Sequence, residues 1–228
     1  QLSPYDTWSY NSKAKALLKL GNYKDAITSS NKSLEINPLD AEAWTGQGNA
    51  FYIMGQSNLA LGSYNNSVEI DPTFEEAWSA RAKIFNLLGN SEEALSSSES
   101  AISLNENDSE AWLNKAIALN KKEQYAEGLS SSTKSLEIDP VNALAWKNKG
   151  IALLGLKKFN EALLSYNEGI KIDFSDAEAW AGKGMALAEM GMYEEALNSY
   201  NASLDLDKSK SDIWAKKSKV LNELAMYD

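Results

Sequence analysis

Few side chains in this chain are of a type that carries out chemistry. The sequence contains no Cys and no His, which removes thiol nucleophiles, Cys-ligated zinc and the commonest general base. Two adjacent carboxylate pairs, Glu92-Glu93 and Glu194-Glu195, remain as candidates for acid–base work. Each pair stands where a helix is expected to begin, and adjacent residues on a helix do not face each other. The sequence therefore predicts no catalytic residue.

Two short glycine motifs imitate part of a phosphate-binding loop. They are Gly46-Gln47-Gly48 and Gly182-Lys183-Gly184. A phosphate-binding loop needs glycines between a strand and the start of a helix, whereas both motifs fall inside expected helices. We therefore expect no cofactor and no metal site in this chain.

The charge of the chain limits its partners. Asp and Glu number 32 against 22 Lys and Arg, which gives a formal net charge of −10. Such a surface repels phosphate backbones and anionic membranes, so we expect no binding to nucleic acid. No apolar run approaches the length of a membrane span, and no signal peptide is recognisable, so we expect no membrane insertion and a cytoplasmic location.

A single spacing organises the sequence. Six tryptophans recur every 34 residues: Trp44, Trp78, Trp112, Trp146, Trp180 and Trp214. A fixed period of this size is typical of stacked repeats, in which no unit can bury its apolar face alone. After a lead-in segment, residues 1–6, we expect one array over residues 7–228. Its six full repeats are 7–40, 41–74, 75–108, 109–142, 143–176 and 177–210, and a partial seventh covers 211–228.

Each repeat is expected to form two helices joined by a turn. In the second repeat, apolar side chains recur at helical spacing on both sides of Gly55. Glycine readily adopts the positive φ that ends many helices, so Gly55 marks the turn. The same position is held by Gly21, Gly89 and Gly191. The residue before the next helix is a capping aspartate at Asp40, Asp108 and Asp176. No segment alternates like a strand, and the expected fold class is all-α.

Two positions of the repeat vary together. Repeats with Gly48, Gly150 and Gly184 carry Tyr64, Tyr166 and Tyr200. Repeats with Ala14, Ala82 and Ala116 carry Ser30, Ser98 and Ser132. Glycine with a large ring, and alanine with serine, is what two facing positions of limited joint volume require. We predict that these positions touch between the two helices of one repeat.

The pattern resembles the tetratricopeptide repeat, a 34-residue helix–turn–helix unit. The second repeat supplies the family's signature positions with Trp44, Gly48, Phe51, Gly55, Ala60, Tyr64, Ser67 and Pro72. The resemblance covers nearly the whole chain, but Gly128 replaces the usual Ala, and Glu106, Phe174 and Lys208 replace Pro. It implies a right-handed superhelical solenoid of antiparallel helix pairs, with the tryptophans in its core.

In this family the first helices line a concave groove, with positions 2, 5, 9 and 12 of each repeat pointing into it. Carried over to this sequence, the N-terminal half of the groove contains Asn11, Lys15, Thr45, Asn49, Tyr52, Ser79, Lys83 and Asn86. The C-terminal half contains Leu113, Ile117, Asn120, Leu144, Lys147, Ile151, Leu154, Met185 and Asn222. Asn and Lys can hold peptide carbonyls or carboxylates, and exposed Leu, Ile and Met can receive apolar side chains.

The expected function is a protein–protein interaction scaffold whose groove binds an extended peptide or a partner helix, with no catalysis of its own. Three alternatives stay open. Neighbouring helices could fill the apolar half, the chain could be a structural module that assembles end to end, or it could be the regulatory arm of a larger protein. Docking of a chaperone carboxylate, which some family members perform, is disfavoured because Asn11 and Lys15 stand in the reverse order.

The last repeat is expected to be incomplete. Residues 211–224 fit a first helix, and Trp214, Ser218 and Leu221 are placed to pack on the sixth repeat. An apolar stripe would then remain for a missing second helix, formed by Ile213, Val220 and Leu224. We expect the natural chain to continue past Asp228, and this stripe to pair with a second copy in a homo-oligomer.

Overall fold

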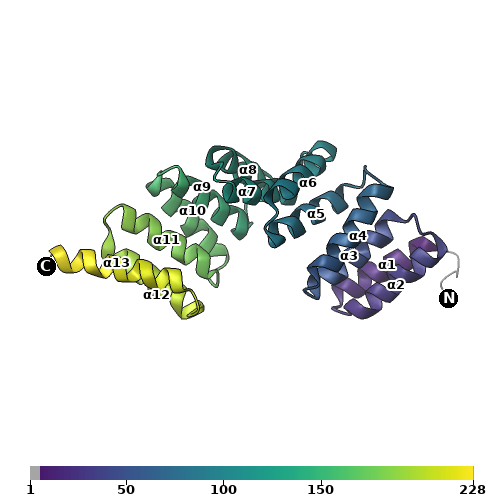
Figure 1. Ribbon diagram of the computed structural model, residues 1–228, viewed down its shortest axis with the longest axis horizontal. Coiled ribbons are helices and arrows are strands. Elements are labelled where there is room, and N and C mark those ends of the chain that lie inside the picture. Colours follow the sequence, from purple (N-terminus) through teal and green to yellow (C-terminus); the bar gives the residue numbers. More distant parts are fainter. Residues whose placement is uncertain (1–5, 228) are drawn as a thin grey trace. The chain divides into compact units, whose positions relative to one another are not determined.

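The computed structural model describes residues 6–227 and contains, within them, thirteen helices and no strand. The first helices of the repeats are α1 (Thr7–Lys19), α3 (Ala41–Ile53), α5 (Glu75–Leu88), α7 (Ser109–Lys121), α9 (Ala143–Gly155), α11 (Ala177–Glu189) and α13 (Ser211–Tyr227). The second helices are α2 (Tyr23–Ile36), α4 (Ser57–Ile70), α6 (Ser91–Leu104), α8 (Tyr125–Ile138), α10 (Phe159–Ile172) and α12 (Tyr193–Leu206). The all-α solenoid of antiparallel helix pairs is confirmed, and every first helix begins where the 34-residue period predicts (Figure 1).

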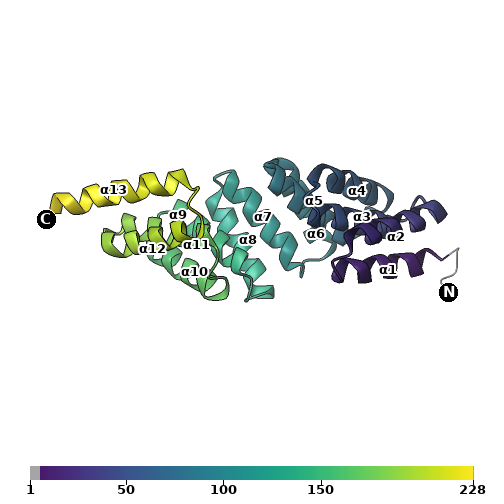
Figure 2. The ribbon, with the colours of Figure 1, turned by 90° about the horizontal axis from the view of Figure 1, so that it is seen from below.

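The chain forms two compact units, unit 1 (Gln1–Asn114) and unit 2 (Lys115–Asp228), whose boundary falls inside α7. In unit 1, α1 contacts α3 and α3 contacts α5; in unit 2, α9 contacts α11 and α11 contacts α13 (Figure 2). Among the described helix contacts, second helices touch first helices only. The first helices of each unit therefore form a layer of their own, and we call its free surface the first-helix face of that unit.

The ends of the helices follow the expected local rules. Four turn glycines have φ between 74° and 83°: Gly21, Gly55, Gly89 and Gly191. At the same position of two other repeats, Glu123 and Lys157 each have a φ of 59°, which is unusual for a residue with a Cβ. The capping role of the aspartates is confirmed, because carboxylates accept backbone N–H bonds at 3.1 Å in the pairs Asp40–Ala43, Asp108–Ala111 and Asp176–Ala179. Across the described residues, no helix has the length and apolar character that crossing a membrane requires.

The two helices of a repeat pack through the positions that vary together. A Cβ atom placed on Gly48 would lie 2.5 Å from Cε1 of Tyr64, which is far inside van der Waals contact. The corresponding distances are 2.8 Å for Gly150 and Tyr166, and 2.6 Å for Gly184 and Tyr200. All three tyrosines are buried. The predicted contact between these positions is confirmed.

The tryptophans are not fully buried, contrary to the expectation, and lie at the edge of the core, against which Trp180 packs. Trp44 and Trp146 are half-buried, and Trp214 is 48% exposed. Each indole N–H donates to a carbonyl six residues earlier, as Trp146 does to Pro140 at 2.9 Å. The same bond is made by Trp44, Trp78, Trp112, Trp180 and Trp214. Each indole thus fixes the loop between two repeats to the first helix that follows it. Because this contact lies at the surface, the rings stay partly exposed to solvent.

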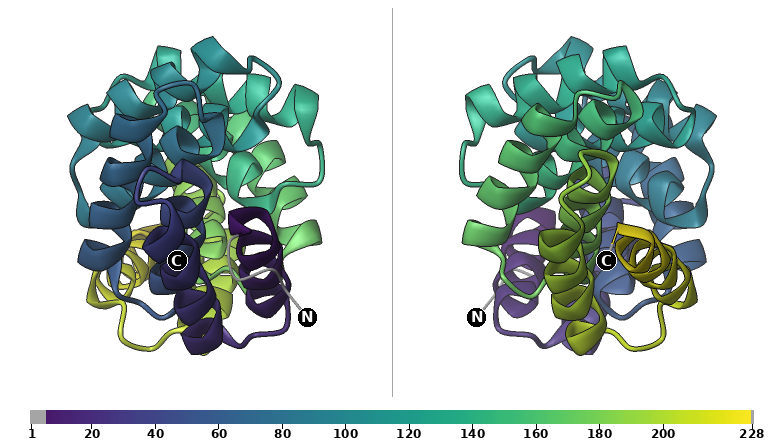
Figure 3. Two further views of the ribbon diagram at one scale, coloured as in Figure 1. Left: turned by 90° about the vertical axis from the view of Figure 1, so that its right-hand side faces the viewer. Right: turned by 90° about the vertical axis from the view of Figure 1, so that its left-hand side faces the viewer.

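Helix α13 presents the opposite face from the one expected. Ile213 and Val220 are 3% and 4% exposed and pack with Leu187 and Tyr200 of the sixth repeat. The outward residues are Trp214 and Leu221, each 48% exposed. Figure 3 shows α12 and α13 (yellow-green and yellow) in front in its right panel, and α1 and α2 (purple) in front in its left panel. The prediction of an apolar stripe free to pair with a second copy is wrong, because Ile213 and Val220 pack against the preceding repeat, as Ala179 and Ala186 of α11 do. Leu224 is half-buried.

Candidate functional site

The predicted groove residues divide into an exposed group and a buried group. Exposed or half-buried side chains belong to Lys15, Asn49, Tyr52 and Lys83 in unit 1, and to Ile117, Leu144, Lys147, Ile151, Leu154, Met185 and Asn222 in unit 2. Six others are only 2% to 7% exposed: Asn11, Thr45, Ser79, Asn86, Leu113 and Asn120. For Asn11, Asn86 and Leu113 the expectation of an open groove is wrong, because these side chains are buried. Ser79, Thr45 and Asn120 are buried too, but each lines a pocket.

The buried asparagines join consecutive repeats. Asn86 donates its side-chain N–H to the backbone carbonyl of Asn114 at 2.8 Å. Asn120 makes the equivalent bond to the carbonyl of Asn148 at 2.9 Å. Asn11 donates to the capping carboxylate of Asp40 at 3.0 Å. These side-chain N–H groups bond polar atoms of the next repeat and so hold consecutive repeats together.

A second row of contacts crosses the first-helix face of unit 1, from position 9 of one repeat to position 2 of the next. It consists of Lys15–Glu42 at 2.6 Å, Asn49–Glu76 at 3.2 Å and Lys83–Glu110 at 2.6 Å. The glutamates were missed in the sequence-based site, although their own 34-residue recurrence marks them. Such exposed pairs contribute little stability each, but the polar side chains of this face are already bonded to one another.

Lys83 illustrates the electrostatics of this row. Burial lowers the pKa of Lys83, but the hydrogen bond and charge of Glu110 outweigh that effect, so the pKa lies above its ordinary value. The ammonium nitrogen also lies 5.2 Å from the centre of the Tyr52 ring, within range of a cation–π interaction. An aromatic face and a carboxylate thus hold one lysine in place.

In unit 2, the junction between the fourth and fifth repeats breaks this polar pattern. Ile117 stands at position 9 and Leu144 at position 2, where the junctions of unit 1 have a polar residue and a glutamate. Leu144 is 40% exposed. Together with Ile151, these side chains line a shallow pocket of about 250 Å³. The face therefore presents apolar surface where the junctions of unit 1 present a polar pair.

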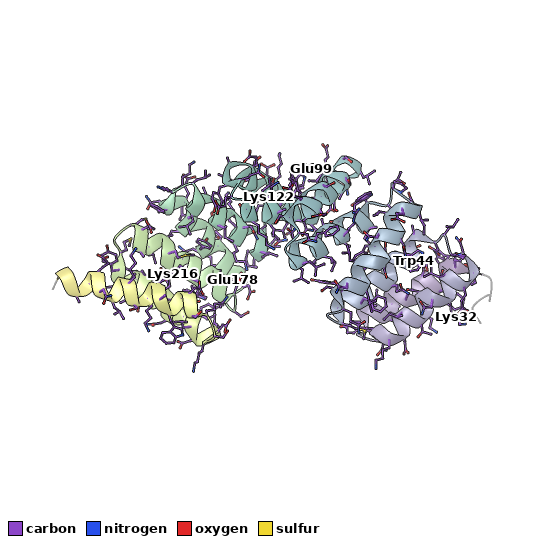
Figure 4. The ribbon with its side chains drawn as sticks, in the orientation of Figure 1. Lys32, Trp44, Glu99, Lys122, Glu178 and Lys216 are labelled. Carbon is purple, nitrogen blue, oxygen red and sulfur yellow. The ribbon has the colours of Figure 1, made fainter. Side chains whose placement is uncertain are left out.

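Lys147 borders the same pocket but is held by acidic groups. Its ammonium lies 2.8 Å from Asp176 and 2.9 Å from Glu178, which stands at the start of α11 (Figure 4). Burial lowers the pKa of Lys147, and the bonds to both carboxylates raise it by more, so it ends above its ordinary value. The same lysine lowers the pKa of Glu178. Lys147 is thus a fixed, charged wall of the pocket.

A second pocket of unit 2 lies next along the face, with a volume of about 620 Å³. Leu154, Met185 and Tyr200 are among its lining residues. Burial raises the pKa of Tyr200 to about 12, so the phenol stays neutral and can donate or accept a hydrogen bond. Its charged lining residues are Lys157, Lys216, Lys219, Glu189 and Glu223; Lys216 lies on α13 (Figure 4). Apolar walls with mixed charges suit an amphipathic ligand better than a purely polar one.

Unit 1 has a pocket of its own, of about 910 Å³. Tyr52, Phe74 and Ala80 give it apolar walls. Its charged lining residues are Lys19, Lys83, Glu75, Glu76, Asp108 and Glu110. In the part of the chain that the structure describes, no group of three or more acidic side chains is arranged to hold a metal ion.

Comparison with known proteins identifies the repeat. Sequence profiles described as tetratricopeptide repeat match residues 11–73, 75–108, 109–142 and 177–210. No curated protein sequence matches the chain significantly. The chain is thus a protein of stacked helical hairpins. It belongs to the tetratricopeptide-repeat family.

Solved structures share the fold at low sequence identity. The APC/C hetero-tetramer Cut9–Hcn1 matches with a TM-score of 0.83 at 18% identity, over 96% of this chain and 43% of that chain. This chain therefore spans less than half the length of that relative. YrrB, described as having an unusual peptide-binding site, matches with a TM-score of 0.62 at 23% identity, over 77% of this chain and 90% of that one. TTC0263 of Thermus thermophilus matches with a TM-score of 0.64 at 16% identity, over 80% of this chain and 99% of that one. Family and fold together define a protein–protein interaction scaffold.

Proposed function

We propose that this scaffold binds an extended peptide on the first-helix face of unit 2 and carries out no catalysis of its own. The peptide would place apolar side chains against Ile117, Leu144 and Ile151 in the first pocket. It would continue to Leu154 and Met185 in the second. All five side chains come from first helices, α7, α9 and α11.

One observation carries this proposal. Each junction of unit 1 has a polar pair on its exposed side, such as Lys15 and Glu42. At the junction between the fourth and fifth repeats, the equivalent residues are the apolar Ile117 and Leu144. Leu144 remains 40% exposed, although burying a leucine fully is worth about 1.5–3 kcal/mol. An exposed apolar patch lined by polar residues usually marks an interface.

The repeat supplies a substitution that removes the patch and keeps the fold. Changing Ile117→Lys and Leu144→Glu converts this junction into the Lys–Glu pair of Lys15–Glu42 and Lys83–Glu110. Glutamate already occupies the equivalent of Leu144 at Glu178. The double variant should therefore fold as the parent does, which circular dichroism and thermal unfolding would verify.

The test begins with peptides selected from a random twelve-residue display library on the intact chain. Isothermal titration should show that the double variant binds the selected peptides at least about thirtyfold more weakly, which corresponds to about 2 kcal/mol. The matched control is Leu164→Glu, because Leu164 is an apolar side chain of α10 that is 65% exposed and lies outside both pockets. Equal weakening in the control, or unchanged affinity in the double variant, would exclude this face as the binding site.

A further inference from the structure

The same pair of acidic residues recurs where consecutive repeats meet. A capping aspartate is followed two residues later by a glutamate in Asp40–Glu42, Asp108–Glu110 and Asp176–Glu178. The three pairs stand at equivalent positions, since 68 residues, two full repeats, separate each from the next. The way in which each pair is satisfied can therefore be compared directly.

In two of the three junctions, the side chain at position 5 of the preceding repeat contacts both carboxylates of the pair. Asn11 donates to Asp40 at 3.0 Å and to Glu42 at 3.3 Å. Lys147 places its ammonium 2.8 Å from Asp176 and 2.9 Å from Glu178. The two carboxylates thus form an acceptor site for a hydrogen-bond donor, and in one junction that donor is the ammonium of a lysine.

In the middle junction, Ser79 takes the place of Asn11 and Lys147 and is too short to do the same. Ser79 is 6% exposed, and its hydroxyl oxygen is buried without a hydrogen-bond partner. One oxygen of Asp108 caps α7 by accepting from the backbone of Glu110 and Ala111. Within the described chain, no side chain donates to the other oxygen. In the first repeat Ser33 also donates to Asp40, but its counterpart in the third repeat is Ala101, which cannot.

The acceptor site at Asp108, which lacks a donor, belongs to the pocket of unit 1, because Ser79, Asp108 and Glu110 all line that pocket. Two further carboxylates of the pocket accept hydrogen bonds from neutral amides: Glu75 from Asn105 at 2.9 Å, and Glu76 from Asn49 at 3.2 Å. The four carboxylates of the pocket outnumber its two lysines, Lys19 and Lys83, and Lys83 is already bound to Glu110. Unit 1 as a whole has 15 acidic against 7 basic residues, which adds to the attraction for a cation.

We propose that the pocket of unit 1 binds a lysine side chain of a partner polypeptide, with its ammonium at Asp108 beside Ser79. An ammonium is the group that the equivalent carboxylates Asp176 and Glu178 already hold. The aliphatic part of the lysine would lie along the apolar walls that Phe74 and Ala80 provide. This site is separate from the peptide-binding face of unit 2 and does not depend on it.

Binding can be measured by nuclear magnetic resonance on the whole chain, with the peptide acetyl-Leu-Lys-Leu-amide as the probe. The backbone signals of Ser79 and Asp108 should shift and saturate with this peptide. A matched peptide with Nε-acetyllysine has the same stem without the charge, and should leave them unchanged. Equal shifts with both peptides would overturn the proposal.

Two variants test the site at Asp108 and keep the rest of the pocket: one fills the site with an ammonium, and the other removes its charge. Ser79→Lys supplies an internal ammonium at the position of Lys147, and should reduce peptide affinity at least about tenfold while raising the melting temperature. Asp108→Asn should also reduce affinity about tenfold, since a charged partner strengthens a hydrogen bond. It should still cap α7, because Asn142 caps α9 by accepting from Ala145 at 3.1 Å.

The control is Glu69→Gln, which removes one charge from an exposed position of α4 outside the pocket. It should change affinity by less than about twofold, because solvent and salt screen distant surface charges. If Ser79→Lys does not fold, Asp108→Asn decides the question alone. Parent-like binding in Asp108→Asn, or an equal loss in Glu69→Gln, would show that the peptide is attracted by general charge and not by this place.

Discussion

Gly48 on α3 and Tyr64 on α4 face each other so closely that the glycine has no room for a Cβ atom; such an atom would lie 2.5 Å from the ring. Tyr64 is 1% exposed, and its hydroxyl donates to the side chain of Asn49 at 2.8 Å. Repeats with alanine and serine at these positions reach the same helix pairing without a ring. The two combinations are therefore alternative ways of filling one volume.

The first prediction concerns this pair. Gly48→Ala should lower the free energy of unfolding by about 1–3 kcal/mol through overpacking, although alanine favours helices more than glycine does. In a Tyr64→Ser background the same change should cost nothing or stabilise by up to about 1 kcal/mol, because the double variant reproduces the pair Ala14 and Ser30. Urea unfolding of the two single variants and the double variant gives the coupling energy. Additive effects would contradict the contact.

The second prediction concerns the bond that the tryptophans make to the loops. Trp146→Phe keeps a ring but loses the N–H donated to Pro140 at 2.9 Å, and should cost about 1 kcal/mol. Trp146→Ala should cost about 2 kcal/mol, which is below the usual value for a fully buried tryptophan because the ring is half-buried. Thermal unfolding measures both. A phenylalanine variant as stable as the parent would mean that the indole bond contributes nothing.

The third prediction concerns the turn between α7 and α8. Glu123 has a φ of 59° where four other repeats have glycine. A left-handed conformation costs a residue with a Cβ about 1–2 kcal/mol, so Glu123→Gly should stabilise the protein by about 0.5–1 kcal/mol after the entropy cost of glycine. Glu127→Gly, inside α8, is the control and should destabilise by about 1 kcal/mol. If both glycines destabilise equally, the turn is not strained at Glu123.

The fourth prediction concerns pH. The pKa of Glu178 is lowered, first by its hydrogen bond with Lys147. A lowered pKa in the folded protein stabilises it above the unfolded value of about 4.3, and this contribution is lost as the pH falls through the folded value. Glu178→Gln should therefore be less stable than the parent at neutral pH, by about 0.5 kcal/mol at this exposed position, and the difference should shrink as the pH falls below about 4. A difference that does not shrink in acid would have a cause other than this charge.

The sequence predicted those parts of the structure that depend on spacing along the chain. The period placed the start of every first helix from Thr7 to Ser211, and the paired variation of glycine and tyrosine predicted a contact between helices. It did not predict how far each first helix is rotated toward the next repeat. Leu113 and Leu144 look alike in the sequence, yet one is 5% and the other 40% exposed.

The candidate site was predictable only in part for the same physical reason. A helical pattern shows which residues share a face, whereas the neighbouring repeat decides whether that face is covered. Asn11 looked like a ligand for a peptide and instead binds Asp40. Glu110 was not among the predicted site residues, yet it pairs with Lys83, 27 residues earlier. Ser79 could be recognised as exceptional only once its two counterparts were seen to hold an acidic pair.

The most direct test of the central claim is a methyl spectrum of the chain, labelled at Ile, Leu and Met, during titration with a selected apolar peptide. The account predicts that the largest shifts occur at Ile117, Leu144, Ile151, Leu154 and Met185, and that Leu164 on α10 stays unchanged. Shifts concentrated on Leu164 and other methyl groups of the second helices, with the five first-helix residues unmoved, would contradict it.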